Sequence, residues 1–223
     1  MKKLFAVLVI IVFAVTSVYA KPKKRGRQVK PKKKVSSMTG YKIGIAGGPG
    51  MSIAYQPEYK NKSAFWLIMQ ENKPAVGGMA LIDNYYYFID FAGVNLAAGF
   101  HSVQSKWKGT DELNVSRSYT YTGYYVGARV GPAFQYSNFF LNADFQFLYR
   151  VKDSKKIDST DYNTLGATSM PLGAAVNVGY RLSLGPIKIP MGIEYMYLHK
   201  IHTDPSGYKV VNHSINLYTG VLF

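Results

Sequence analysis

Apolar and polar residues alternate with a period of two over long stretches of this chain. In residues 139–151 the odd positions are apolar, as at Phe145 and Tyr149, whereas the even positions include Asn142, Asp144 and Gln146. Successive side chains of a β-strand point to opposite faces, so the pattern predicts a strand with one apolar and one polar face. Helical periodicity is missing beyond residue 34, and the sequence therefore predicts an all-β fold.

The same alternation marks eight segments separated by turn residues. They are residues 41–55, 79–90, 94–107, 119–136, 139–151, 169–184, 187–200 and 211–223. Short connections are expected near residues 91–93, 137–138 and 185–186, and long ones over residues 56–78, 108–118, 152–168 and 201–210. An even number of strands joined by alternately short and long connections predicts an eight-stranded antiparallel up-and-down β-barrel over residues 39–223.

The polarity of the two faces distinguishes a membrane barrel from a soluble one. A soluble barrel of the lipocalin kind fills its interior with large apolar groups and turns its charges outward. Here charged, amide and glycine residues share one face, and the opposite face is continuously apolar with aromatic ends. Such a face needs lipid, so we predict a transmembrane barrel. Residues 79–90 are apolar on both faces; Asp83 is assigned to the inner one because charge among lipid tails costs roughly 2 to 4 kcal/mol for a basic group and less for an acid.

The first 20 residues have the features of a secretory signal peptide. Lys2 and Lys3 precede an apolar stretch over residues 4–15, and cleavage is expected after Ala20. The chain contains no Cys. This excludes a lipoprotein anchor, a disulfide framework, a zinc finger and a cysteine nucleophile. No stretch of about 18 apolar residues follows residue 34, so no transmembrane helix is expected after cleavage.

Much of the formal net charge of +15 lies in one short arm, residues 21–38. Its basic residues are Lys21, Lys23, Lys24, Arg25, Arg27, Lys30, Lys32, Lys33 and Lys34. Export argues against nucleic acid as the partner of this arm. Two interpretations stay open: a disordered periplasmic tether, or contact with anionic lipid head groups or an acidic envelope polymer.

The C-terminal segment carries a pattern known from one class of membrane protein. Phe223 follows the apolar residues Val221, Leu217 and Ile215 at alternate positions, interrupted only by Thr219. This resembles the aromatic signal by which bacterial outer-membrane barrels are recognised for assembly. With the signal peptide and the strand pattern, the chain resembles the small outer-membrane barrels of the OmpX, OmpW and OmpA-domain type, without favouring a subfamily.

The resemblance implies a location and a set of partners. We expect a monomer in the outer membrane with both ends of the mature chain in the periplasm, because eight strands cross an even number of times. Outer-membrane lipid, lipopolysaccharide and the barrel assembly machinery are its expected partners.

Charged residues on the inner face are predicted to meet in the lumen. Antiparallel counting places Asp83 beside Gly99, Gly99 beside Arg129, and Arg129 within a diagonal step of Asp144. Asn177 and Glu194 follow at a similar height, and Arg181, Arg150, Lys188 and Lys42 are further inward cations. We predict an ion-pair cluster of Asp83, Arg129, Asp144, Arg181 and Glu194 in a lumen with room for side chains only. A gated ion path through rearranged pairs is the alternative.

Catalytic and metal sites have little support in the sequence. His199, His202 and Asp204 lie close together near one barrel rim, but His199 falls on the lipid-facing side and no fourth ligand follows. These residues and His213 are interpreted as interfacial, His101 has no recognisable partner, and the Gly44, Gly47, Gly48, Gly50 cluster is interpreted as close packing. We therefore predict no catalytic residue, metal or cofactor.

Three functions remain. The first is a non-enzymatic barrel with a salt-bridged, largely closed lumen and long loops for structural or surface-interaction roles. The second is a narrow OmpW-like channel for small or apolar molecules. The third is an enzyme at the rim that acts on outer-membrane lipid.

Overall fold

The computed structural model describes residues 39–55, 68–110, 115–161, 170–203 and 209–223. The expected signal peptide with Ala20, the basic arm 21–38 and Asp204 lie outside the described residues. Within these ranges no helix is long or apolar enough to cross a membrane.

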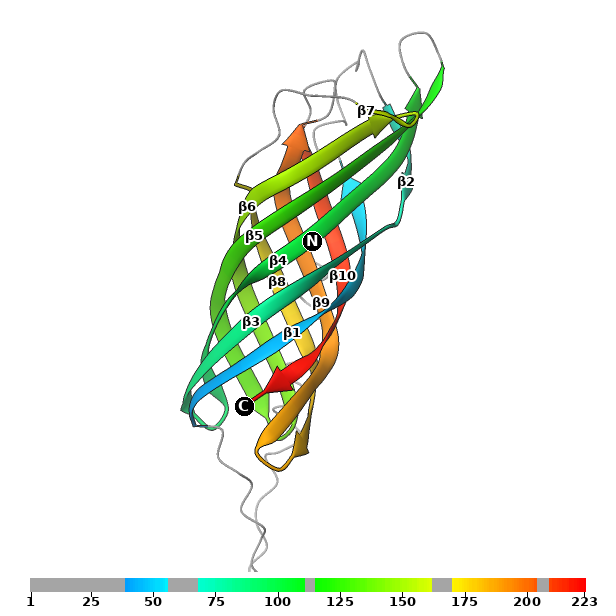
Figure 1. Ribbon diagram of the computed structural model, residues 1–223. Helices are drawn as coiled ribbons and strands as arrows, with labels where there is room; N and C mark the ends of the chain where they lie inside the picture. The colour runs from blue at the N-terminus through cyan, green and yellow to red at the C-terminus, as the bar shows by residue number, and fades with distance from the viewer. Residues whose placement is uncertain (1–38, 56–67, 111–114, 162–169, 204–208) are drawn as a thin grey trace, which may run out of the picture. The chain divides into compact units, whose positions relative to one another are not determined.

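Ten strands make up the fold, and eight of them form a closed ring. The strands are β1 (Gly40–Tyr55), β2 (Ile68–Lys73), β3 (Ala75–Ile89), β4 (Ala92–Thr110), β5 (Ser116–Tyr136), β6 (Phe139–Ile157), β7 (Thr160–Asp161), β8 (Leu172–Leu184), β9 (Ile187–Thr203) and β10 (Lys209–Leu222). The ring runs β1-β3-β4-β5-β6-β8-β9-β10, and every neighbouring pair is antiparallel. The predicted eight-stranded meander is confirmed (Figure 1).

The first and last strands close the ring. β1 pairs with β10 from Gly44 opposite Leu222 to Tyr55 opposite Val211. Beyond this ladder, the backbone N–H of Phe223 donates to the carbonyl of Ile43 at 2.8 Å, and the N–H of Ile43 donates back at 3.4 Å. The C-terminal segment is therefore a structural part of the barrel seam.

Three tight connections lie together at one end of the barrel, where the chain also ends (Figure 1). They join β3 to β4, β5 to β6 and β8 to β9 through two residues each. The turns at 137–138 and 185–186 are as predicted, and the first lies at 90–91 instead of 91–93. Ser137 and Gly185 open two of them with φ of 56° and 65°. Positive φ at this position suits a hairpin turn whose twist matches that of the flanking strands.

At the opposite end the strands are longer than the sequence pattern predicted. β4 continues to Thr110, β5 begins at Ser116 and β6 continues to Ile157. Much of the segments expected as the long connections 108–118 and 152–168 is thus strand, because the polar residues there still pair across the sheet. We call residues 102–110, 116–122 and 152–157 the β4–β6 extension. The short strands β2 and β7 pair with its two edges, on β4 and β6 respectively.

Two register shifts change which side chains face inward. Tyr124 pairs with Lys152 but Tyr125 pairs with Arg150, so Val151 has no partner on β5 and the face pattern of β6 reverses after it. A second shift lies between Val210 and Asn212 of β10. Val211 is only 3% exposed there, so the apolar alternation of residues 211–223 does not place it on the exposed wall with Ile215 and Leu217. An extra residue in one strand of a pair is a β-bulge, and it locally interrupts the alternation of inward and outward side chains.

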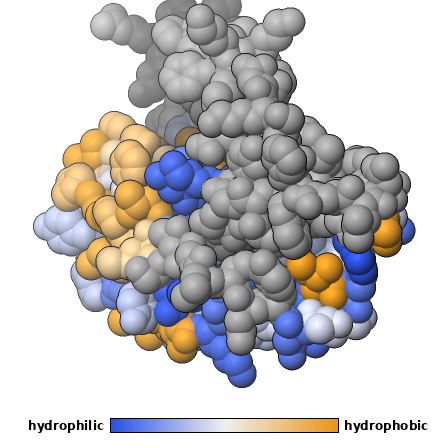
Figure 2. All heavy atoms as spheres, turned by 90° about the horizontal axis from the view of Figure 1, so that it is seen from above, coloured by the Kyte–Doolittle hydropathy of each residue, from blue (hydrophilic) through white to orange (hydrophobic). Residues whose placement is uncertain are grey.

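Below the β4–β6 extension the outer wall is a continuous apolar belt. Exposed aromatic residues lie near both edges: Phe100, Tyr124, Tyr149 and Tyr195 toward the extension, and Tyr86, Phe88, Phe91, Phe139, Tyr180 and Phe223 toward the short turns. Phe145 and Phe147 of β6 lie between these edges. An end-on view shows hydrophobic side chains along the wall, with hydrophilic ones between them (Figure 2). Aromatic girdles at both edges of an apolar band are typical of transmembrane barrels.

Candidate functional site

Arg129 lies at the centre of the lumen and contacts three carboxylates. Its Nη1 lies 2.5 Å from Glu194, its Nη2 3.2 Å from Asp83 and its Nε 3.6 Å from Asp144. The Arg129 side chain is 1% exposed and the three acids are equally enclosed. The structure thus brings together four of the five residues predicted for the ion-pair cluster.

Neutral donors supply the rest of the hydrogen bonding to these acids. Asn216 donates to Glu194 at 3.1 Å, and Asn95 donates to Asp144 at 3.3 Å. The hydroxyl of Tyr218 donates to Asp83 and lies 3.0 Å from the hydroxyl of Tyr85. Because one guanidinium faces three carboxylates, these donors offset part of the repulsion among the acids.

The register of the strands explains how these side chains meet. Asp83 lies opposite Ala97, and Ala97 lies opposite Arg129. The expected pairings of Asp83 and Arg129 with Gly99 are therefore wrong by two residues. For Asp83 the cause is that the turn lies at residues 90–91 and that an irregularity follows Tyr87. A two-residue slip keeps the same face, so the acid still points inward. Arg129 is paired with Gln146, which leaves Asp144 on the expected diagonal.

Arg181 does not join the Arg129 cluster. Its Nη1 donates to the hydroxyl of Tyr87 at 2.8 Å and to the side-chain oxygen of Gln135 at 2.7 Å. Its guanidinium carbon lies 4.9 Å from the ring centre of Phe140 and 5.0 Å from that of Tyr85. Arg181 occupies an aromatic layer nearer the short turns, and its predicted membership of the ion-pair cluster is corrected accordingly.

The other inward cations also lie apart from Arg129. Arg150 Nη1 is 3.4 Å from Asp153, and Lys155 Nζ is 3.6 Å from the same carboxylate. Burial lowers the pKa of Lys155, which faces inward in the β4–β6 extension. Lys42 pairs with Tyr85 and Lys188 with Leu222, which places both near the short turns.

One cavity beside the cluster is small. A cavity lined by Gly44, Asp83, Tyr85, Arg181 and other residues has a volume of about 10 Å³. That is room for about one water molecule. The side chains of Gln146 and Asn177 are fully enclosed and have no hydrogen-bond partner among the described residues, so the interior is polar as well as narrow.

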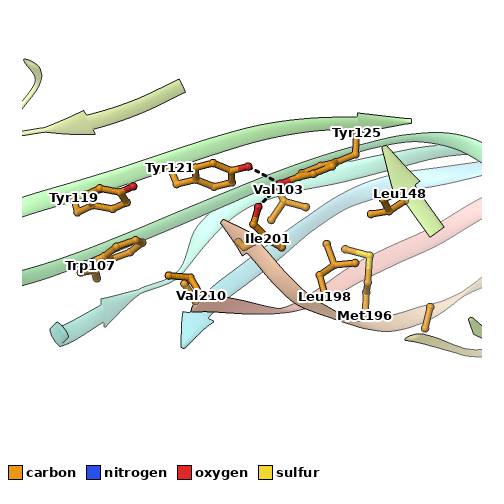
Figure 3. Close-up of a cluster of buried hydrophobic side chains, with 12 residues drawn as sticks. Val103, Trp107, Tyr119, Tyr121, Tyr125, Leu148, Met196, Leu198, Ile201 and Val210 are labelled. Atoms are coloured by element: carbon orange, nitrogen blue, oxygen red, sulfur yellow. Dashed lines mark hydrogen bonds between the residues drawn. The ribbon is translucent and has the colours of Figure 1, made fainter. Parts of the chain in front are cut away.

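A second, apolar layer of buried side chains lies in the barrel interior toward the β4–β6 extension (Figure 3). Trp107 packs on Tyr119 with ring centres 3.9 Å apart, and the hydroxyls of Tyr121 and Tyr125 lie 2.5 Å from each other. The layer consists of Ala54, Val103, Trp107, Tyr119, Tyr121, Tyr125, Leu148, Ala175, Met196, Leu198, Ile201 and Val210. The sequence analysis missed this layer, although inward positions on residues 103–107 and 119–125 change there from polar to aromatic or aliphatic.

The described histidines are not arranged as a metal centre. His213 Nδ1 lies 2.6 Å from the hydroxyl of Tyr195, and His199 Nδ1 lies 3.2 Å from that of Tyr197. Both histidines lie on the outer face, as expected from their parity. His101 is inside the lumen and 2% exposed. Among the described residues no group of three His, Cys, Asp or Glu residues is placed to hold a metal ion; the side chain of His202 is not described.

The glycines of β1 let neighbouring groups approach closely. A Cβ on Gly44 or Gly48 would meet the backbone carbonyl of Val221 or Leu217 on β10. A Cβ on Gly50 would clash with the side chain of Asn216, which donates to Glu194. The small residues of this strand therefore leave space for the polar layer on its neighbour.

The residues of the expected assembly signal lie on the outer face of the seam. Ile215, Leu217, Val221 and Phe223 are all exposed on the barrel wall. They continue the apolar belt to the end of the chain.

No known protein family and no curated protein matches this sequence. Solved structures do resemble it in fold. Ail, the attachment invasion locus protein of Yersinia pestis, is 15% identical with a TM-score of 0.43, over 83% of this chain and 100% of Ail. The outer membrane protein AlkL is 14% identical with a TM-score of 0.46, over 89% of this chain and 97% of AlkL.

The outer membrane protease OmpT from Escherichia coli is 9% identical with a TM-score of 0.42, over 85% of this chain and 99% of OmpT. The expected β-barrel fold is confirmed by the ring of eight strands, and these outer-membrane proteins are similar to the chain in fold without distinguishing a subfamily.

Proposed function

We propose that this chain is a non-enzymatic, integral outer-membrane barrel with a closed lumen, whose role is structural or lies in surface interaction. Its short turns and both ends of the mature chain would face the periplasm, and the β4–β6 extension would face the outside of the cell. The following features of the chain support this proposal.

The outer wall supports a membrane location. Phe145, Val178 and Leu217 lie on three different strands of the ring, and each is more than half exposed. A soluble monomer rarely exposes a contiguous apolar surface of more than a few hundred Å². A belt that continues around a whole barrel is stable where lipid covers it.

The filled lumen carries the proposal of a closed barrel. Arg129 and its three acids bridge β3, β5, β6 and β9 across the interior, and the apolar layer around Trp107 covers the end near the extension. The cavity beside the cluster has space for about one water molecule, and this supports a lumen that, within the described residues, lacks the continuous aqueous path of larger porins.

The histidine contacts support a role other than catalysis. A general base must reach the proton that it removes, and a catalytic metal needs several converging ligands. The rim histidines His199 and His213 are hydrogen-bonded to tyrosines on the lipid-facing side, and His101 is enclosed in the lumen.

Conductance measurements on the refolded barrel test this proposal. The protein is isolated from outer-membrane fractions and compared on gels with and without heating, and a closed barrel is expected to shift in mobility. Inserted into planar bilayers, it is expected to produce no steady channels. Steady ion-selective conductance would favour the narrow channel instead, and hydrolysis of outer-membrane lipid by the purified protein would favour the rim enzyme.

A further inference from the structure

The outward face of the β4–β6 extension is polar and basic directly beyond the apolar belt. Three rows of side chains cross the sheet in register: Ser102, Tyr124 and Lys152; then Gln104, Thr122 and Ser154; then Lys106, Thr120 and Lys156. On all three strands the change follows the last aromatic residues of the belt. The sheet therefore continues while the surface that it presents changes from lipid-like to hydrogen-bonding.

This face carries a groove with a volume of about 400 Å³. Hydroxyls of Ser118, Thr120 and Thr122 on the middle strand β5 line it, as do Lys106 on β4 and Lys156 on β6. Thr120 is in register with both lysines, so the two ammonium groups flank a row of hydroxyls. Gln104 adds an amide that donates to Thr122 at 3.2 Å.

The groove is positively charged. Its carboxylate, Asp158, is held by Arg117 at 3.0 Å and by the backbone N–H of Ser118 at 2.8 Å. Lys156 lies 3.8 Å from Asp161, but both side chains are about half exposed or more, so solvent screens this pair. Lys106 forms no ion pair with any residue that the structure describes.

The height of the groove identifies the molecule that it would meet. Thr120 and Lys106 lie four and six residues beyond the aromatic residues Tyr124 and Phe100 on their strands. At about 3.4 Å per residue and a tilt of about 40°, the groove lies roughly 10 to 15 Å beyond the belt. The headgroup layer of a phospholipid leaflet is only roughly 5 to 8 Å thick. A lipid that contacts the groove must therefore extend beyond a phospholipid headgroup, as the sugar phosphates of a larger glycolipid would.

We propose that this groove binds the phosphorylated sugar headgroup of an outer-leaflet glycolipid. Lys106 and Lys156 contact phosphate oxygens, and Thr120, Thr122 and Gln104 exchange hydrogen bonds with sugar hydroxyls. Lysine is a common point-charge ligand of phosphate. The groove lining lacks the buried aromatic and arginine anchors that dominate protein interfaces, which favours a glycolipid over a protein partner. The proposal rests on the membrane orientation given under Proposed function.

Binding of lipopolysaccharide to the detergent-refolded, full-length barrel tests the groove. Affinity is measured by titration for lipopolysaccharide, for the same material after removal of its phosphates, and for phosphatidylglycerol micelles. In the variant Lys106→Gln/Lys156→Gln we expect affinity for lipopolysaccharide to fall about 10- to 30-fold, given the usual contribution of one basic residue near an anionic surface. Thr120→Val retains both charges and is expected to weaken binding about 3- to 5-fold through one lost hydrogen bond.

The matched control is Lys42→Gln/Lys188→Gln, which removes two positive charges near the short turns. It is expected to leave the affinity unchanged, and heat-dependent gel mobility checks that every variant is folded. Three results would each contradict binding in the groove. They are a loss of affinity in the control equal to that in Lys106→Gln/Lys156→Gln, an affinity for the dephosphorylated lipid equal to that for lipopolysaccharide, and an affinity for phosphatidylglycerol equal to that for lipopolysaccharide. Channel conductance would contradict the closed lumen but not this binding, so the two proposals fail separately.

Discussion

At the scale of single residues, one guanidinium organises the interior of the barrel. Arg129 lies between Asp83, Asp144 and Glu194, with Tyr218 and two asparagines completing the hydrogen bonds of the acids. A charge enclosed in this way is costly to desolvate and is tolerated because its partners surround it. Removing one member of the cluster is therefore expected to lower the stability of the barrel strongly.

We expect Arg129→Ala to destabilise the barrel by about 3 to 5 kcal/mol, because three enclosed carboxylates lose the cation that they share. The measurement is urea unfolding followed by tryptophan fluorescence and gel mobility. Arg117→Ala is the control, since Arg117 pairs with Asp158 on the surface and its loss is expected to cost about 1 kcal/mol or less. Equal stability of the two variants would contradict an enclosed ion-pair cluster.

Asp144→Asn is expected to be much milder than Glu194→Gln. Asp144 has the longest of the three contacts to Arg129, 3.6 Å against 2.5 Å for Glu194. Removing its charge also removes its repulsion with Asp83 and Glu194, so we expect a change within about 1 kcal/mol for Asp144→Asn. The same unfolding experiment compares the two variants. A larger loss for Asp144→Asn than for Glu194→Gln would contradict this ranking.

The sequence predicts which side of the barrel wall the residues of the Arg129 cluster point to, but not all of their contacts. Alternation placed Arg129, Asp144 and Glu194 in the lumen, because parity needs no knowledge of register, and the cost of a charge among lipid tails placed Asp83 there. Arg181 obeys the same parity, yet its height is set by the turn between β8 and β9 and by the rings of Tyr85 and Phe140. Contacts across a barrel depend on tilt and stagger, which alternation does not encode.

At the scale of strands, closure depends on the pair of β1 and β10. The ladder continues past its regular part through the two hydrogen bonds between Ile43 and Phe223. An unpaired strand edge in lipid would leave backbone polar groups without partners, which costs several kcal/mol for each group. The seam is thus the element on which both stability and assembly depend.

Deleting Phe223 is expected to lower the yield of folded barrel in membranes severalfold. The deletion removes two backbone hydrogen bonds of the seam and an exposed aromatic side chain at the edge of the belt. Phe223→Tyr retains both features and is expected to assemble normally. The fraction of heat-modifiable protein in outer membranes measures the effect, and an unchanged fraction after the deletion would refute the role of this residue in assembly.

The bulges are the part of the strand pattern that the sequence did not predict. One bulge lies at Val151 and the other beside Val211. Neither is flanked by a glycine or proline that would mark the extra residue in the sequence. The extended ends of β4, β5 and β6 were missed for a related reason. Their outward residues are polar as in a loop, and the apolar inner layer around Trp107 and Tyr121 is the reason that they remain strands.

At the scale of the whole barrel, polarity is reversed between two levels. In the belt, apolar residues face outward and the Arg129 cluster faces inward; in the β4–β6 extension, Lys106 and Thr120 face outward while Trp107 and Tyr119 face inward. Each level hides its apolar face from water, one in lipid and the other in the barrel interior. The level at which the pattern reverses therefore marks the expected edge of the membrane on that side.

Single cysteines test this orientation directly, because the chain contains no Cys of its own. Lys108→Cys lies on the outward face of the extension, Pro186→Cys in a short turn, and Val178→Cys in the apolar belt. In whole Gram-negative cells, a membrane-impermeant maleimide is expected to label Lys108→Cys alone. Permeabilising the outer membrane should add labelling of Pro186→Cys, because its turn then becomes accessible from the periplasm. Val178→Cys should react only after heat unfolds the barrel, since lipid excludes the polar reagent from the belt. Labelling of Pro186→Cys on intact cells would mean that the barrel is inserted in the opposite direction, and labelling of Val178→Cys on the folded protein would mean that the belt does not face lipid.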